Sequence, residues 1–119
     1  MLMDGDVRLR VVFFRSAVGA EPVRDWLKDL ERKDRKTIGE DIKTVQFGWP
    51  LGMPLVRKLE SELWEVRSQL PRGIARVIFT VQRDLMILLH GFIKKSQRTP
   101  LSDLKVARTR LAQFKEHTS

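Results

Sequence analysis

Three apolar segments joined by short turns constrain the fold of this chain more than any other feature. Residues 63–68 (LWEVRS), 74–82 (IARVIFTVQ) and 85–93 (LMILLHGFI) are rich in β-branched and long aliphatic side chains, which favour strands. Pro71 and Gly73 interrupt the chain between the first two, and Arg83 and Asp84 connect the last two. Such short connections join strands that run antiparallel side by side. The segment from 63 to 93 therefore predicts a three-stranded meander.

Helical patterns lie on both sides of the meander. Residues 7–14 (VRLRVVFF) predict a further strand, and two amphipathic helices follow it with apolar residues at helical spacing. We expect Asp34 to cap the second helix and Gly48 to end it in a left-handed conformation. After the meander, we expect Thr99 to cap a third helix that has Pro100 in its first position. The apolar stripes of the three helices are Val23, Trp26, Leu27 and Leu30, then Ile38, Ile42 and Val45, then Leu101, Leu104, Leu111 and Phe114.

The order β-α-α-β-β-β-α predicts an α+β fold. We expect a four-stranded, mainly antiparallel sheet packed with a helical hairpin and a C-terminal helix in two layers. At 119 residues and 13.9 kDa, the chain has the size of one domain, which we assign to residues 1–119.

Positive charge is concentrated in the second half of the chain. Lys and Arg number 23 against 15 Asp and Glu, a net charge of +8. Residues 1–56 hold ten bases and nine acids, which is +1, whereas residues 57–119 hold thirteen and six, which is +7. An excess of this size predicts an anionic partner, with nucleic acid as the first candidate.

Several classes of protein are disfavoured by what the sequence lacks. It has no cysteine and only two histidines, His90 and His117, so we expect no metal site and no cofactor. Nucleotide-binding glycine loops and the GxSxG motif of serine hydrolases are missing from the sequence. The N-terminal residues lack the pattern of a signal peptide, so we expect none, and no apolar stretch of about 20 residues occurs. We therefore expect a cytoplasmic protein without a membrane partner.

Basic residues on the predicted strands are the best candidates for chemistry. Arg67, Arg76 and the Lys94–Lys95 pair converge on one edge if their strands are neighbours. Arginine grips phosphate in bidentate fashion, and a lysine crowded by other cations loses its proton more easily. The alternative for Arg67 is a surface ion pair with Glu65 or Glu60, and for His90 it is a structural role in its strand.

The blocks LWEVR, GIARVIF and LLHGFIKKSQRTP resemble the C-terminal half of HigB-type toxins of the RelE/ParE superfamily, including their phage-derived relatives. The resemblance extends over residues 7–114 and implies a type II toxin–antitoxin toxin. Such toxins cleave mRNA on the ribosome without a metal, by attack of the ribose 2′-hydroxyl on the adjacent phosphate. A helix-turn-helix antitoxin (HigA-like) holds them inactive. The implied partners are therefore this antitoxin, the ribosome and mRNA.

By position in these blocks, Arg76 is the strand arginine of GIARVIF and Arg67 is the arginine of LWEVR. Several superfamily members use a tyrosine or histidine near the C-terminus, but this chain has no tyrosine. The general base therefore stays open among Lys94, Lys95 and His90. We expect catalytic roles for Arg76, Lys94, Lys95 and His90, and RNA or phosphate binding by Arg67, Arg72, Arg98, Lys105 and Arg108.

Two other functions remain alternatives to the ribonuclease. A toxin of the same fold acts on DNA gyrase in ParE-type systems, and arrest with broken DNA but intact mRNA would favour it. The other alternative is a non-catalytic module that binds nucleic acid through phosphate contacts alone, with a salt-dependent affinity and no turnover.

Overall fold

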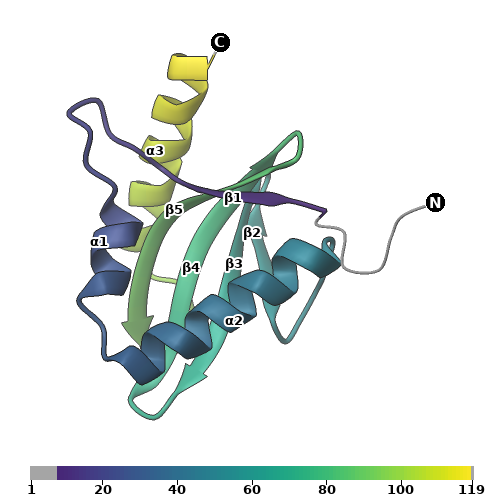
Figure 1. Ribbon diagram of the computed structural model, residues 1–119, viewed down its shortest axis with the longest axis vertical. Helices are drawn as coiled ribbons and strands as arrows, with labels where there is room; N and C mark the ends of the chain where they lie inside the picture. The colour runs from purple at the N-terminus through teal and green to yellow at the C-terminus, as the bar shows by residue number, and fades with distance from the viewer. Residues whose placement is uncertain (1–7, 119) are drawn as a thin grey trace.

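The protein was analysed as a computed structural model that describes residues 8–118 (Figure 1). It has an α+β fold with the predicted order of elements and one additional strand. The elements are β1 (Arg10–Phe13), α1 (Pro22–Lys28), α2 (Arg32–Gly48), β2 (Val56–Glu60), β3 (Leu63–Leu70), β4 (Gly73–Gln82), β5 (Leu85–Lys94) and α3 (Leu101–Thr118).

The sheet has five strands in the order β1-β5-β4-β3-β2. Strands β2 to β5 form antiparallel pairs, as predicted for the meander, and β1 joins β5 in parallel. The expectation of four strands was wrong because β2 pairs with β3 at the edge of the sheet. An edge strand can carry charged side chains, and Arg57 and Lys58 in its middle hide the apolar pattern that would identify a strand. The expected strand 7–14 is observed as β1, and Val7 lies outside the described residues.

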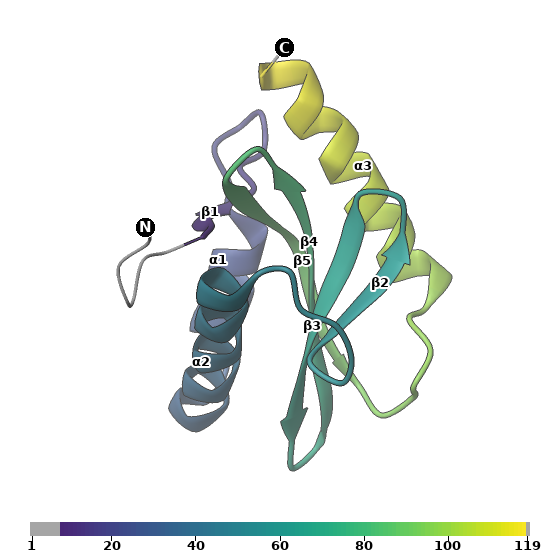
Figure 2. The same ribbon diagram turned by 90° about the vertical axis from the view of Figure 1, so that its right-hand side faces the viewer.

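Helices cover both faces of the sheet, so the expected two layers become three (Figures 1 and 2). Side chains on β4 alternate between the two faces, as the sequence predicts. Val77 and Phe79 belong to the hydrophobic cluster on the α1–α2 side. Ile78, together with Leu89 and Phe92 of β5, belongs to the cluster that packs against Ala107 of α3. The α3 face is the one that carries Arg76.

The expected boundaries of the second helix are wrong at both ends. Helix α2 begins at Arg32, and Asp34 lies in its first turn without capping it. Asp34 is buried and forms an ion pair with Arg72 at 3.7 Å. Gly48 is the last helical residue, and the glycines with positive φ in the described part of the chain are Gly19 and Gly73. The helix therefore ends without a left-handed glycine.

Replacing Gly91 with alanine should destabilise the protein strongly. Gly91 lies on β5 under the ring of Trp26, and an added Cβ would overlap several ring carbons, including Cδ2 at 2.9 Å. Overpacking of this kind costs about 3 kcal/mol of the free energy of unfolding, which urea titration measures. Gly39→Ala is the matched control, because Gly39 is an exposed position on α2 with nothing within 4 Å of its added Cβ. That substitution should stabilise by about 0.5–1 kcal/mol, and equal effects of the two would contradict the packing of α1 described here.

Candidate functional site

Three arginines lie on adjacent strands of the α3 face, and we call them the arginine row: Arg57, Arg67 and Arg76. Arg67 on β3 is directly opposite Arg76 on β4. Arg57 on β2 is opposite Glu65, which precedes Arg67 by two residues and shares its face. The prediction that the strands carrying Arg67 and Arg76 are neighbours is confirmed.

Arg76 is fully buried beneath the segment that joins β5 to α3. Its guanidinium donates hydrogen bonds to the carbonyl oxygens of Ser96 and Arg98, the latter at 3.2 Å. It also lies 5.6 Å from the centre of the Phe92 ring, a cation–π distance. Its Nε atom is buried and has no hydrogen-bond partner among the described residues. Arg76 is therefore held by neutral acceptors on two of its nitrogens and by none on the third.

The other two arginines bind the same segment. Arg67 pairs with Glu65 at 2.7 Å, and both side chains are buried, at 4% and 0% exposure. Arg67 also donates to Oε1 of Gln97 at 2.9 Å, and Arg57 donates to the Gln97 carbonyl at 3.0 Å. The Arg67–Glu65 pairing that the sequence offered as an alternative is confirmed, but it is a buried pair and not a surface pair.

Thr99 connects to this cluster and does not cap the third helix as expected. Its hydroxyl donates to the free carboxylate oxygen of Glu65 at 2.8 Å. Helix α3 starts at Leu101, and the Pro100 carbonyl accepts the hydrogen bond from the Leu104 N–H.

The arginine row carries more positive charge than its surroundings neutralise. Among the described residues, one buried carboxylate, that of Glu65, contacts the row, through Arg67. Burial lowers the pKa of Arg76 from its ordinary value; the charges of Glu65 and Asp103 oppose this change, while those of Arg67 and Arg57 add to it. Because like charges held together out of water repel each other, an anion placed here would be strongly attracted.

His90 sits beside the row with both ring nitrogens engaged. Nε2 lies 2.7 Å from Oδ1 of Asp103, and Nδ1 lies 3.4 Å from a guanidinium nitrogen of Arg110. Arginine can only donate, so Nδ1 accepts and the ring proton on Nε2 points to Asp103. Arg110 also donates to the Leu89 carbonyl at 2.8 Å. His90 thus ties β5 to α3, which matches the structural role considered for it.

The remaining predicted site residues fall into two groups. Lys94, half exposed, lies 3.5 Å from Asp103. Lys95 and Arg98 are exposed in the segment between β5 and α3, and Lys105 is exposed on α3. Arg108 is bound to Glu60 by a bidentate contact, which raises the pKa of Arg108 and lowers that of Glu60. Arg72 pairs with α2, so the structure separates it from the arginine row.

Sequence reasoning missed Arg57 as a member of the site. Its strand was not predicted, so no pattern placed it beside Glu65. The available signal was the alternation of side chains between the two faces along residues 56–60. It places Arg57 on a face only once these residues are known to form a strand.

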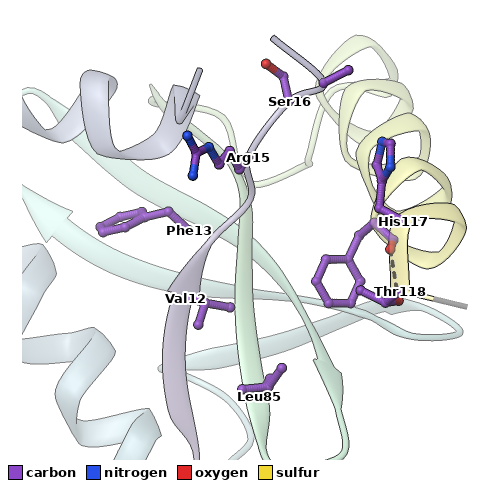
Figure 3. A pocket seen from close by; sticks show the side chains of 9 residues that line it. Val12, Phe13, Arg15, Ser16, Leu85, His117 and Thr118 are labelled. Atoms are coloured by element: carbon purple, nitrogen blue, oxygen red, sulfur yellow. Dashed lines mark hydrogen bonds between the residues drawn. The ribbon is translucent and has the colours of Figure 1, made fainter. Parts of the chain in front are cut away.

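A cavity lies elsewhere, between the end of β1 and the C-terminal turn of α3 (Figure 3). It has a volume of about 500 Å³, and Phe13, Leu85 and Phe114 contribute apolar walls. His117 and Arg15 lie at its border, where Figure 3 shows them on opposite sides. The arginine row does not line it. Within residues 8–118, no group of three potential metal ligands comes together, and no helix is long and apolar enough to cross a membrane.

Comparison with known proteins gives one family. The family model described as Phage derived protein Gp49-like (DUF891) matches residues 25–112. This range contains all of the arginine row, Glu65, His90 and most of α3. No curated protein matches the chain.

Proposed function

Because the chain belongs to the Gp49-like family of phage-derived proteins, we propose that it is a HigB-type toxin of a type II toxin–antitoxin pair. The fold agrees with this proposal, since the RelE/ParE resemblance implies an α+β fold with a helical hairpin before the strand meander and a helix after it. The observation that carries the proposal is the excess of guanidinium charge on the α3 face, at the strands that hold the LWEVR and GIARVIF blocks.

The proposed activity is metal-independent cleavage of mRNA on the ribosome. The ribose 2′-oxygen attacks the adjacent phosphorus, the bond from phosphorus to the 5′-oxygen breaks, and a 2′,3′-cyclic phosphate and a 5′-hydroxyl form. A base removes the 2′-hydroxyl proton, and an acid protonates the departing 5′-oxygen. Arg76 and Arg67 stabilise the additional negative charge on the phosphate oxygens as the transition state forms.

Lys94 and Lys95 are the proposed proton carriers of this reaction. They follow β5 directly, and both side chains reach solvent. His90 was an equal candidate in the sequence, but its two occupied nitrogens favour a positioning role, in which it holds Asp103 near Lys94. Arg98, Lys105 and Arg108 extend the basic surface for phosphate contacts along the mRNA or the ribosomal RNA.

The proposed partners are a helix-turn-helix antitoxin, the ribosome and mRNA in the cytoplasm. The antitoxin would keep the toxin inactive until it is removed. Finding a small helix-turn-helix protein encoded beside this chain would support the pairing directly.

Inducing the chain without an antitoxin should arrest growth and leave cuts inside translated transcripts. Mapping of the new 5′ ends should place them within reading frames, because the substrate is mRNA on the ribosome. The variant Lys95→Gln should reduce the cuts, whereas Lys36→Gln should not. Both remove one exposed lysine charge, but Lys36 is on α2, across the sheet. Intact transcripts during arrest contradict the ribonuclease, and broken DNA in the same cells identifies the gyrase-directed alternative.

A further inference from the structure

The segment that covers the arginine row is held by hydrogen bonds and not by apolar packing. We call residues 95–100 the β5–α3 loop; Figure 2 shows it running out from the end of β5 before it returns to α3. Neither hydrophobic cluster of the described residues includes any residue from 94 to 103. Residues 95–98 are exposed. The loop therefore has little apolar surface to lose if it moves away from the sheet.

The loop's acceptors occupy the arginine donors. Carbonyl oxygens of Ser96, Gln97 and Arg98 and the side-chain oxygen of Gln97 receive hydrogen bonds from the row. All these acceptors are neutral. The bonds to the loop have one charged partner, the guanidinium, whereas a phosphate oxygen adds the attraction of an opposite charge and its geometry fits the bidentate fork.

We infer that the β5–α3 loop is a displaceable lid, and that the arginine row under it is a binding site for the phosphodiester backbone of single-stranded RNA. The loop carbonyls hold the places that phosphate oxygens take when the lid opens. Arg57 becomes a third member of the site, beside Arg67 and Arg76, and the unused Nε of Arg76 supplies a further donor. The inference deepens the proposed function and rests on it for the identity of the nucleic acid.

Opening requires only that RNA prefer the open form. A ligand shifts a conformational equilibrium by its difference in affinity for the two states. When the loop lifts, its carbonyls and the glutamine side chain become hydrated, because they belong to residues that already reach solvent. The row meanwhile exchanges neutral acceptors for anionic ones. The phosphodiester thus relieves the charge excess that the closed state retains.

Loosening the lid should therefore tighten RNA binding. Gln97→Ala removes the side-chain contact to Arg67, and Thr99→Val removes the hydroxyl contact to Glu65, while all arginines remain in place. We expect each variant to bind a ten-nucleotide 2′-O-methyl RNA about fivefold more tightly than the unmodified protein, because more of the protein is in the open state. Fluorescence anisotropy of the labelled oligonucleotide measures this. The 2′-O-methyl groups prevent cleavage, so the assay reports binding alone.

Hydrogen exchange locates the movement. Saturation with the same oligonucleotide should speed amide exchange in residues 95–99 and slow it on β3 and β4. Three results would contradict the lid: amide exchange in the loop that does not change, binding by both loosened variants that is equal to or weaker than that of the unmodified protein, or no binding by any of the proteins. A melting curve for each variant confirms that it is folded.

A matched pair of charge changes tests the contribution of Arg57. Arg57→Gln should weaken oligonucleotide binding several-fold and reduce the salt dependence of log Kd by about one unit. Arg32→Gln removes the same charge from the exposed start of α2, across the sheet, and should change neither. If the two substitutions weaken binding equally, the oligonucleotide responds to the net charge of the protein alone, and Arg57 is not part of a binding site. Inorganic phosphate, added as competitor, should displace the oligonucleotide only at far higher concentration, since a single anion cannot span the row.

These results are independent of whether the protein is a ribosomal nuclease. If transcripts stay intact in cells but the oligonucleotide still opens the loop, the lid is supported and the proposed reaction is contradicted. If transcripts are cut but the loop does not respond, the reaction stands and the lid fails.

Discussion

Replacing Arg76 with alanine should reduce the rate of mRNA cleavage on purified ribosomes by about 100- to 1000-fold. Removing one preorganised donor to a developing negative charge has effects of this size. The protein should stay folded with a lowered melting temperature, because the change removes a buried side chain and the donor of two loop carbonyls but leaves the other contacts of the loop in place. Arg67 and Arg57 still hold the loop through Gln97.

Arg110→Ala is the matched control for this change. Arg110 also donates to a main-chain carbonyl, lies 5.9 Å from a phenylalanine ring centre, that of Phe14, and has a pKa lowered by burial. It differs in position, since it lies on α3 away from the arginine row. Its loss should lower the melting temperature but leave the cleavage rate within about fivefold, because Arg110 contacts no member of the arginine row and reaches the site only through the His90 ring. If both variants lose cleavage equally, or Arg76→Ala keeps it, the role of Arg76 is structural alone.

The sheet and the proximity of two arginines could be predicted from the sequence because both follow from local patterns. Alternation along 74–82 places Arg76 on the face opposite Val77, and short turns make β3, β4 and β5 neighbours. The register that sets Arg67 against Arg76 was not predicted, because β3 runs to Leu70 and β4 starts at Gly73, so the turn is shorter than the segments 63–68 and 74–82 suggest. The resemblance pointed to the same two residues.

The covering of these arginines could not be predicted. The loop acceptors are mainly backbone carbonyls, and every residue type carries one, so the sequence SQR at 96–98 gives no signal of what binds there. His90 is similar. Its partners Asp103 and Arg110 lie 13 and 20 residues away on a helix, and only the packing of α3 on β5 brings them together. The fifth strand, β2, was also missed, because its charged residues do not show a strand pattern and only its pairing with β3 identifies it.

Replacing Glu65 with glutamine should lower the free energy of unfolding by about 3–5 kcal/mol. Glu65 is the only carboxylate in direct contact with the arginine row among the described residues, and both it and Arg67 are buried. The neutral amide can still accept from Thr99, but it leaves Arg67 buried without its ion-pair partner, and Asp103 becomes the remaining carboxylate whose charge acts on Arg76. Removing one partner of a buried pair is costly for this reason, whereas a solvent-exposed pair contributes little. Urea titration at neutral pH measures the loss.

Two further variants separate charge from packing. Glu60→Gln removes a carboxylate whose partner Arg108 is well exposed, so its urea midpoint should change little. The double variant Glu65→Leu with Arg67→Met removes both charges of the buried pair and should recover much of the stability that Glu65→Gln loses, since an apolar pair of similar volume replaces the ion pair and Arg67 is no longer a buried cation without a partner. A double variant as unstable as Glu65→Gln would mean that Glu65 acts through shape. If Glu65→Gln leaves the free energy of unfolding unchanged, the charges of the arginine row are screened by water. Either result would remove the electrostatic reason for an anion to bind there.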